Sequence, residues 1–353
     1  MTSQARIRVL VVDDSVVIRR LVTHALSEDP EIEVVGGAAN GVLALKMVEA
    51  TKPDAITLDI EMPEMDGIET LRRLRKLHPQ LVVIMFSTLS ERGAAVTLEA
   101  LSLGANDYVT KAANVGSLNV SLGRLRDDLV PKIKQFFVSR KRPEPAVGKP
   151  ATAAPPIPAQ RPAIIRKAVA IGVSTGGPNA LADIIPLIPP AFALPVFIVQ
   201  HMPPIFTRFL AERLQNLTRL NVCEAADGMR VEARTVYIAP GDYHMRVVKK
   251  GADKFVTLDR AEPENFCRPS VDPLFRSVAD VYGGAVVAVI LTGMGQDGRL
   301  GVERLRGEGA WIIAQDQASS VVWGMPGAVA RAGLADVITD LKSVVPEIMR
   351  QLQ

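Results

Sequence analysis

A serine in the second half of the chain has the setting of an enzymatic nucleophile. Ser174 lies in the run GVSTG, directly after the apolar stretch Ala168–Val173 and just before a helical pattern that begins near Pro178. A serine at such a strand-to-helix turn is exposed, and the free N–H groups of the helix N-terminus could stabilise an oxyanion. A glycine-rich phosphate cradle is the alternative, although the run has neither the Walker lysine nor the Rossmann GxGxxG spacing.

A nucleophilic serine needs a base and a carboxylate that orients the base. Among the four histidines, His201 directly follows an apolar run and is expected on the same sheet edge as Ser174. His244 lies in a β-rich segment and is expected at the surface or in a hairpin. Asp297 lies in the glycine-rich loop that follows the apolar run Ala285–Leu291. We therefore expect Ser174, His201 and Asp297 to act as nucleophile, base and acid.

Other carboxylates compete for the third role. Asp297 could instead cap the helix that starts at Gly298, because aspartate is a favoured N-cap residue. Asp272 and Asp316 are rival acids, but Asp272 starts a helical stretch with no strand before it. The combination with Ser174 and His201 favours Asp297.

The first half of the chain carries a different set of reactive groups. Asp13 and Asp14 follow the first apolar run, Asp59 the third, Ser87 the fourth and Lys111 the fifth. In an open parallel sheet such positions meet at the carboxyl edge, where ligands bind. Clustered carboxylates repel each other unless a hard cation lies among them, and Mg²⁺ prefers oxygen ligands. Taken singly, either N-terminal aspartate could merely cap a helix and the lysine could be a solvated surface charge.

These residues require alternating strands and helices to position them. Five short apolar runs precede residue 130, separated by helical patterns, and they predict a doubly wound parallel sheet. Four more such runs follow residue 164, and Val236–Ile238, His244–Val248 and Phe255–Leu258 are expected to form a β-rich insertion that includes a hairpin. The fold class is α/β in both halves.

A proline-rich segment separates the halves. Seven of the twenty residues in Pro143–Pro162 are proline, a composition that favours extended chain and indicates a linker rather than a docking motif for a partner. With 353 residues, the chain is expected to hold two domains. We place a first domain at 1–130, a helix end and linker at 131–163, and a second domain at 164–353.

Composition narrows the possible functions. Hydrophobic residues make up 48% of the chain and charged residues 22%, which excludes disorder as the dominant state. The net charge of +3 is too even to indicate nucleic acid as a partner. Two cysteines, Cys223 and Cys267, form no metal motif and suggest a reducing compartment. Apolar runs are too short for a membrane span, and Asp13 and Asp14 interrupt any signal-type core, so we expect no membrane insertion and a cytoplasmic location.

The first half resembles the receiver domains of response regulators. The resemblance rests on VVDDS at Val11–Ser15, LDIEMPEMDG at Leu58–Gly67, the pair Ser87-Thr88 and the run GANDYVTK that ends at Lys111. It implies that Asp59 is phosphorylated, that Ser87 and Lys111 bind the phosphoryl group, and that Tyr108 is the aromatic switch position. It further implies a Mg²⁺ site formed by the side chains of Asp14 and Asp59 and the backbone carbonyl of Glu61, with Asp13 contributing directly or through a water molecule.

One position departs from the receiver pattern. Ala112 stands where receivers normally have a proline after the lysine, often preceded by a cis bond. A cis bond before a non-proline residue costs about 2.5–4 kcal/mol, so we expect this bond to be trans.

The second half resembles the catalytic domain of the chemotaxis protein-glutamate methylesterases, the CheB family. The motifs AIGVSTGGPNAL, QHMPPIFTRFLAERL, YIAPGDYHM, CRPSVDPLFRSVA, ILTGMGQDG and SSVVWGMP resemble that family in order and spacing over about residues 164–350. The resemblance places Ser174, His201 and Asp297 on the family's catalytic triad and implies oxyanion donors at the backbone N–H groups of Thr175 and Met294.

The two resemblances together imply a phosphorylation-activated hydrolase. It would remove methyl esters from chemoreceptor glutamates and deamidate receptor glutamines, with a chemotaxis histidine kinase as phosphodonor and no cofactor for the esterase step. The alternatives are a receiver-controlled esterase of small molecules and a non-enzymatic transcription regulator. The near-neutral charge and the serine triad disfavour the regulator.

Overall fold

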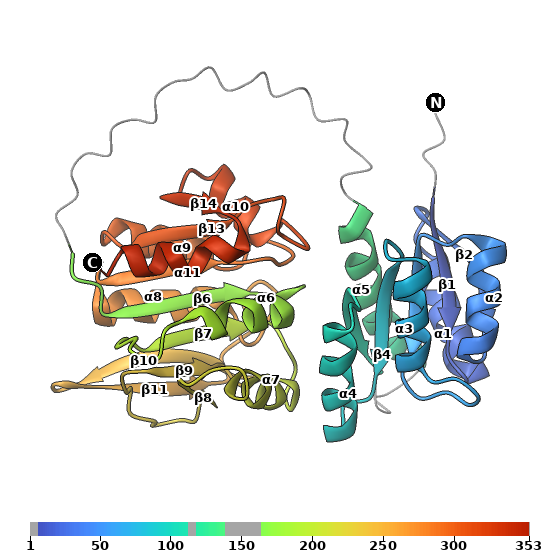
Figure 1. The fold of residues 1–353 in the computed structure, drawn as a ribbon, viewed down its shortest axis with the longest axis horizontal. Helices are drawn as coiled ribbons and strands as arrows, with labels where there is room; N and C mark the ends of the chain where they lie inside the picture. Colours follow the sequence, from blue (N-terminus) through green and yellow to red (C-terminus); the bar gives the residue numbers. More distant parts are fainter. Residues whose placement is uncertain (1–5, 112–117, 138–163, 353) are drawn as a thin grey trace, which may run out of the picture. The chain divides into compact units, whose positions relative to one another are not determined.

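The computed structural model describes residues 6–111, 118–137 and 164–352 of the chain. The chain divides into two compact units, residues 1–146 and 147–353 (Figure 1). Ala112 and the proline-rich segment Pro143–Pro162 lie outside the described residues, so the expectations stated for them stay predictions, as do the domain boundaries.

The first unit has the five-stranded parallel sheet that the apolar runs predict. The strands lie in the order β2-β1-β3-β4-β5 and all pair in parallel (Figure 1). Their bounds are β1 (Ile7–Val12), β2 (Ile32–Ala38), β3 (Ala55–Asp59), β4 (Val82–Ser87) and β5 (Asp107–Thr110). The helices are α1 (Val16–Ser27), α2 (Gly41–Thr51), α3 (Gly67–Leu77), α4 (Glu91–Ser102) and α5 (Leu118–Lys134).

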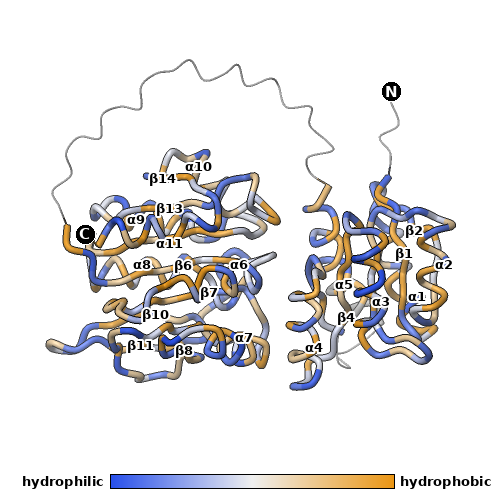
Figure 2. Tube along the Cα trace, in the orientation of Figure 1, coloured by the Kyte–Doolittle hydropathy of each residue, from blue (hydrophilic) through white to orange (hydrophobic). Residues whose placement is uncertain are grey.

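Burial explains why these strands have continuous apolar sequences. β3 and β4 are buried along their whole length, as expected for central strands covered on both faces. Helices α1 and α5 pack on the same core as β1 and β4, through Leu26 and Leu129 among others. Figure 2 shows the matching hydropathy, with hydrophobic stretches along the strands and hydrophilic loops between elements.

The second unit is built on a seven-stranded parallel sheet in the order β14-β13-β12-β6-β7-β9-β8. Its strands are β6 (Ala168–Val173), β7 (Val196–Gln200), β8 (Asn221–Glu224), β9 (Thr235–Ile238), β12 (Val286–Ile290), β13 (Trp311–Gln315) and β14 (Val337–Thr339). The helices are α6 (Gly177–Ile184), α7 (Phe206–Gln215), α8 (Val271–Tyr282), α9 (Arg299–Gly307), α10 (Met325–Arg331) and α11 (Val344–Arg350), with short 3₁₀ turns η2 (Ile185–Leu187) and η3 (Leu341–Ser343).

The predicted insertion is smaller than expected. Only β10 (His244–Lys250) and β11 (Asp253–Asp259) form the antiparallel hairpin. Val236–Ile238 belongs instead to β9, which pairs in parallel with β7 and β8 in the main sheet. The prediction was wrong for this segment because a short buried run looks the same in a hairpin as in a parallel sheet. Strands β8 and β14 were not predicted.

Candidate active site and receiver site

Ser174 follows β6 at the carboxyl edge of the central sheet. Its N–H donates to the carbonyl of Thr292 at 3.0 Å, and its own carbonyl accepts from Gly177 N–H at 2.8 Å. Gly176 has a φ of 80°, a conformation that favours glycine, and it turns the chain from the strand into α6. Gly293 approaches so closely that a Cβ there would lie 2.7 Å from the Cβ of Ser174. These contacts fix the serine backbone on a tight turn.

His201 occupies the corresponding position on the adjacent strand. Its backbone N–H donates to the carbonyl of Val173 at 3.2 Å, which places it beside Ser174 at the ends of β7 and β6. Its Nε2 lies 2.7 Å from Oδ2 of Asp297. His201 and Asp297 are thus brought together as the sequence predicts, although they lie 96 residues apart.

Asp297 lies against the N-terminus of α8. Its Oδ2 accepts from the backbone N–H of Val271 at 2.7 Å, and its Oδ1 accepts from Ser270 Oγ at 2.8 Å and from Asp272 N–H at 3.1 Å. Free N–H groups at a helix N-terminus favour an anion there. Burial would raise the pKa of Asp297, but the hydrogen bond from His201 and these donors outweigh it and lower the pKa to about 2. The carboxylate is therefore charged and fixed in orientation.

The rival acids have other partners. Asp272 is buried and accepts from Gly301 N–H at 2.7 Å, and burial raises its pKa. Asp316 accepts from the backbone and side chain of Ser319. Asp297 does accept from Gly298 N–H, at the N-cap of α9, but five further donors also contact it.

His244 lies in the β10–β11 hairpin, one of the two places expected for it, but it is not at the surface. It is fully buried, because α8 covers this face of the hairpin. Its Nδ1 accepts from Ser270 N–H at 3.2 Å, and its Nε2 lies 3.1 Å from the carbonyl of Glu262. His244 therefore supports the residues that hold Asp297.

Three residues in contact with the proposed triad were not predicted from the sequence to belong to the site. Asn265 Nδ2 lies 3.0 Å from Oδ1 of Asp297, Ser270 donates to that same oxygen, and Cys267 Sγ lies 3.5 Å from Nδ1 of His201. Cys267 and Ser270 belong to the motif CRPSVDPLFRSVA, which runs into α8, and Asn265 lies two residues before it. Membership of this motif or proximity to it is the only sequence signal for them. Burial opposes charging of His201, but Cys267 and Asp297 outweigh it and raise the pKa of His201 to about 10.

The two residues expected to supply oxyanion donors flank the serine. Thr175 is buried, and its carbonyl accepts from Thr292 Oγ1 at 2.9 Å. Met294 follows Gly293, the residue in closest approach to Ser174, and within the described residues its N–H has no hydrogen-bond acceptor. Both backbones therefore lie next to Ser174.

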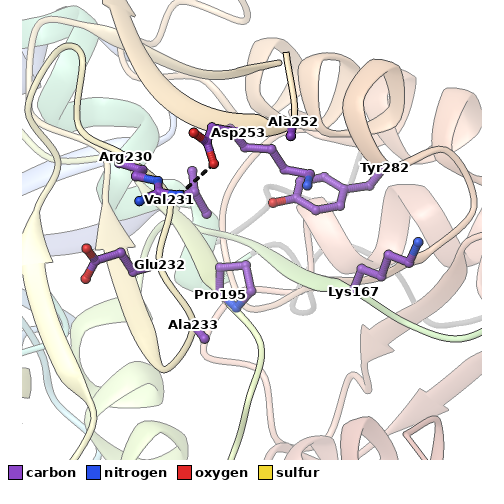
Figure 3. A pocket seen from close by; sticks show the side chains of 10 residues that line it. Lys167, Pro195, Arg230, Val231, Glu232, Ala233, Ala252, Asp253 and Tyr282 are labelled. Atoms are coloured by element: carbon purple, nitrogen blue, oxygen red, sulfur yellow. Dashed lines mark hydrogen bonds and ion pairs between the residues drawn. The ribbon is translucent and has the colours of Figure 1, made fainter. Parts of the chain in front are cut away.

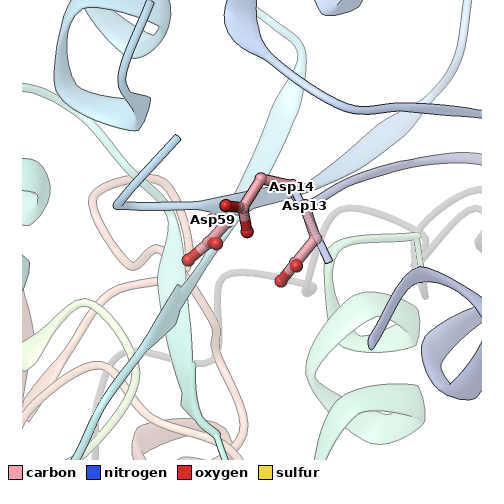
Figure 4. A group of neighbouring side chains, drawn as sticks. All are labelled: Asp13, Asp14 and Asp59. Atoms are coloured by element: carbon pink, nitrogen blue, oxygen red, sulfur yellow. The ribbon is translucent and has the colours of Figure 1, made fainter. Parts of the chain in front are cut away.

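In the first unit, three carboxylates meet at the carboxyl edge of the sheet. Atoms of Asp13, Asp14 and Asp59 lie within 4.8 Å of one another (Figure 4). Ser15 Oγ, rather than either N-terminal aspartate, caps α1 by accepting from Ile18 N–H at 3.4 Å. The capping alternative for these aspartates is therefore excluded by the structure.

Lys111 also reaches this cluster. Its Nζ lies 2.7 Å from Oδ2 of Asp59 and 2.9 Å from Oδ2 of Asp13. Burial raises the pKa of Asp59 to about 6, against the lowering effect of Lys111. Hard oxygen donors this close fit a Mg²⁺ ion. The surrounding hollow is lined by residues that include Asp14, Asp59, Glu61, Thr88 and Lys111.

Ser87 and Tyr108, the other two residues predicted for the receiver site, make their hydrogen bonds away from the carboxylate cluster. Ser87 is buried, and its Oγ accepts from Thr97 Oγ1 at 2.7 Å and lies 3.2 Å from the carbonyl of Gly93, so its bonds run toward α4. Thr88, not Ser87, lines the hollow. Tyr108 is buried, and its carbonyl accepts from Lys132 Nζ at 2.8 Å.

A second hollow lies at the opposite edge of the catalytic sheet. It is lined partly by Lys167 and Pro195, which precede β6 and β7, and Arg230 pairs there with Asp253 at 2.6 Å (Figure 3). Because Ser174 and His201 follow those strands, this hollow is remote from them. None of the helices in the described part of the chain combines the length and apolar character needed to cross a membrane.

Both halves of the chain are similar to known proteins. A family model described as CheB methylesterase matches residues 169–348, and one described as response regulator receiver domain matches residues 9–122. A protein of a Nocardioides species named protein-glutamate methylesterase/protein-glutamine glutaminase is 51% identical over 98% of this chain and 95% of its own length. A protein of the same name from Trichodesmium erythraeum is 48% identical over 98% of this chain and 99% of its own length.

A solved structure resembles the second unit. The CheB methylesterase catalytic domain of Thermotoga maritima aligns with a TM-score of 0.52 and 41% identity, covering 53% of this chain and 99% of that chain. Identity of about half over nearly the whole length, together with the two family matches, establishes the relationship. The chain belongs to the CheB methylesterase family and carries the response regulator receiver domain in front of its catalytic domain.

Proposed function

We propose that this protein, a protein-glutamate methylesterase and protein-glutamine glutaminase by family, hydrolyses chemoreceptor methyl esters through Ser174, His201 and Asp297. The observation that supports the proposal is the 2.7 Å contact between His201 Nε2 and Asp297, made at the strand end adjacent to Ser174. A charged carboxylate on Nε2 holds a proton there, so Nδ1 is the imidazole nitrogen left to act as base.

The reaction follows from this arrangement. Ser174 Oγ attacks the ester carbonyl carbon while its proton passes to Nδ1 of His201. The N–H groups of Thr175 and Met294 stabilise the oxyanion, a role worth about 3–4 kcal/mol per donor in other acyl-transfer enzymes. His201 returns the proton to the methoxy oxygen and methanol leaves. Water, deprotonated by the same nitrogen, then cleaves the acyl-serine and restores the glutamate. A glutamine substrate would release ammonia in place of methanol.

The receiver domain controls this activity through Asp59. Its Oδ atom attacks the phosphorus of the donor to form an acyl phosphate while the bond between phosphorus and the imidazole nitrogen of the kinase histidine breaks, and Lys111 pairs with the transferred group. The side chains of Asp13, Asp14 and Asp59, with the Glu61 carbonyl, would hold Mg²⁺, which when bound neutralises charge on the phosphoryl oxygens. Ser87 would need to exchange its Thr97 contact to reach a phosphoryl oxygen. The esterase residues themselves require no cofactor.

The partners follow from the family. A chemotaxis histidine kinase is the phosphodonor, and the cytoplasmic domains of methyl-accepting chemoreceptors are the substrate, so the protein works in the cytoplasm. The near-even charge gives no support to a nucleic-acid partner. Turnover of a methylated receptor compared with a soluble nitrophenyl ester separates this function from that of a small-molecule esterase.

Trapping the acyl-enzyme tests the nucleophile. The full chain is mixed with methylated receptor, quenched in acid within the first turnover, digested and analysed by mass spectrometry. The expected result is a glutamyl adduct on the peptide that contains Ser174. The adduct should be absent in Ser174→Ala and present in the control variant Ser102→Ala, which removes a hydroxyl on α4 of the receiver. An adduct on another residue would overturn the proposal.

A further inference from the structure

The sulfur of Cys267 occupies the side of His201 that the reaction needs. Cys267 Sγ lies 3.5 Å from Nδ1 of His201, while Nε2 of the same ring contacts Asp297 at 2.7 Å. Both ring nitrogens therefore have partners. Within the described residues, the Oγ of Ser174 makes no hydrogen bond. The base nitrogen is thus held by a thiol and not by the serine.

A neutral imidazole has a single lone pair to accept a proton or a hydrogen bond. With its proton on Nε2, His201 presents that lone pair at Nδ1 alone. Nδ1 has room for one partner in line, so the sulfur of Cys267 and the hydroxyl of Ser174 cannot both contact it. One must leave before the other can transfer its proton, so contact with Cys267 and catalysis by Ser174 exclude each other.

We propose that Cys267 is a positioning residue of the esterase, whose thiol holds Nδ1 of His201 in the resting site and is displaced when Ser174 transfers its proton. The inference rests on the proposed roles of Ser174 and His201. Only the hydrogen bond between Cys267 and Nδ1 changes. Cys267 forms no covalent bond with the substrate and is not oxidised during the cycle. Cys267 thereby sets how readily His201 becomes a free base.

The loop that carries Cys267 is fixed by the same groups that fix Asp297. Asn265 Nδ2 donates to both Asp297 and Asp272, each at 3.0 Å. On the other side of Cys267, the guanidinium of Arg268 contacts Asp242 at 2.6 Å. The thiol is therefore held from both sides and does not rest against His201 by chance.

Charge around the ring gives the contact a measurable consequence. The groups that face His201 are Cys267 from this loop and Asp297 from the loop after β12, with Asp272 and Arg276 of α8 behind Asp297. Cys267 and Asp297 both favour the imidazolium form and so raise the pKa of His201. Removing the sulfur should lower that pKa, because the partner whose contact favours the imidazolium form is lost.

The test is the pH profile of kcat/KM for methanol release by the full chain. Cys267→Ala should move the acid limb to lower pH by about 1 unit, the size expected when one close partner of a charged group is removed. Cys267→Ser should move it in the same direction, because the sulfur that contacts Nδ1 is removed. The matched control is Cys223→Ala, since Cys223 lies in β8 and contacts Met229. A purely structural role for Cys267 would lower kcat without moving the limb.

A second measurement uses the unmodified protein and so does not depend on a variant that folds. Iodoacetamide labelling of Cys267, followed by mass spectrometry across pH with Cys223 as internal reference, reports the thiolate. Because Cys267 contacts the imidazole of His201 and Cys223 does not, the labelling of the two cysteines is expected to depend differently on pH. An unmoved acid limb in both Cys267 variants, or labelling of the two cysteines with the same pH dependence, would overturn the inference. An active Ser174→Ala enzyme would instead overturn the proposed function.

Discussion

His201 presents Nε2, and not Nδ1, to the carboxylate of Asp297 at 2.7 Å. The backbone N–H of Val271 donates to the same carboxylate oxygen, so its position is set by the N-terminus of α8 as well as by the histidine. This relationship places a proton on Nε2, so Nδ1 is the nitrogen that the proposed mechanism uses as base. It also explains how a carboxylate 96 residues away in the chain can orient the ring.

Replacing Asp297 with asparagine should abolish most of the activity. Asp297→Asn can hold the ring in the wrong tautomer and turns an amide N–H₂ toward backbone donors, so methanol release should fall by up to about 10⁴-fold, as for the equivalent change in serine proteases. The matched control is Asp316→Asn, which changes a carboxylate bonded to Ser319 in the same domain. Activity lost in the control and retained in Asp297→Asn would assign the acid to Asp316.

The raised pKa of His201 predicts an alkaline pH profile. Because the base must be neutral, kcat/KM should rise with pH along an acid limb centred above 6.5, the ordinary value for histidine. The same rise in the pKa of His201 affects the stability of the fold in the opposite direction: stability is greater at low pH, whereas activity is greater at high pH. His201 should stabilise the fold fully below about pH 6.5, and this contribution should be lost as pH rises toward about 10. An acid limb at or below pH 6.5, measured with wild type, contradicts this expectation.

His244 should matter for stability and not for chemistry. His244→Ala removes a buried ring and leaves Ser270 N–H without its acceptor, which should cost about 1–3 kcal/mol in the free energy of unfolding. Urea denaturation measures the loss, and methanol release per folded molecule should be largely retained. The comparison is His78→Ala, a histidine in the receiver that pairs with Glu49 at the surface. Unchanged stability with lost activity would make His244 the base.

The sequence predicts which residues lie at the ends of strands. It does not predict which contacts the loops make with those residues. Apolar runs located the ends of β6 and β7, and so the neighbourhood of Ser174 and His201. The partners supplied by Asn265, Ser270 and Cys267 depend on how the segment before α8 folds over the sheet edge, which no periodicity reveals.

Two misplacements have the same physical origin. Val236–Ile238 was assigned to the insertion, and His244, expected at the surface or in a hairpin, lies in the hairpin but is buried, because alternation along a strand does not say what covers each face. The cover here is supplied by α8 and by the neighbouring strands, which are distant in sequence. In the receiver, the strand order placed Asp13, Asp59 and Lys111 together, but the direction of Ser87 toward α4 required coordinates.

Asp59 should carry all of the response to phosphodonor. In Asp59→Asn an amide cannot form an acyl phosphate, so a small phosphodonor should give no increase in methanol release, while basal release persists. Removal of Mg²⁺ by a chelator should reproduce this loss in wild type. The control is Asp127→Asn, an exposed carboxylate on α5 that pairs with Arg126. Basal hydrolysis that stops with chelator would indicate a metal-assisted esterase.

The most direct measurement is methanol release from radiolabelled methylated receptor membranes by the full chain, with and without a small phosphodonor. Wild type should release methanol, and phosphodonor should increase the rate. Ser174→Ala should release none above background in either condition while keeping the folded state and the ability to be phosphorylated on Asp59. Methanol release by Ser174→Ala at the wild-type rate would contradict the assignment of Ser174 as the nucleophile.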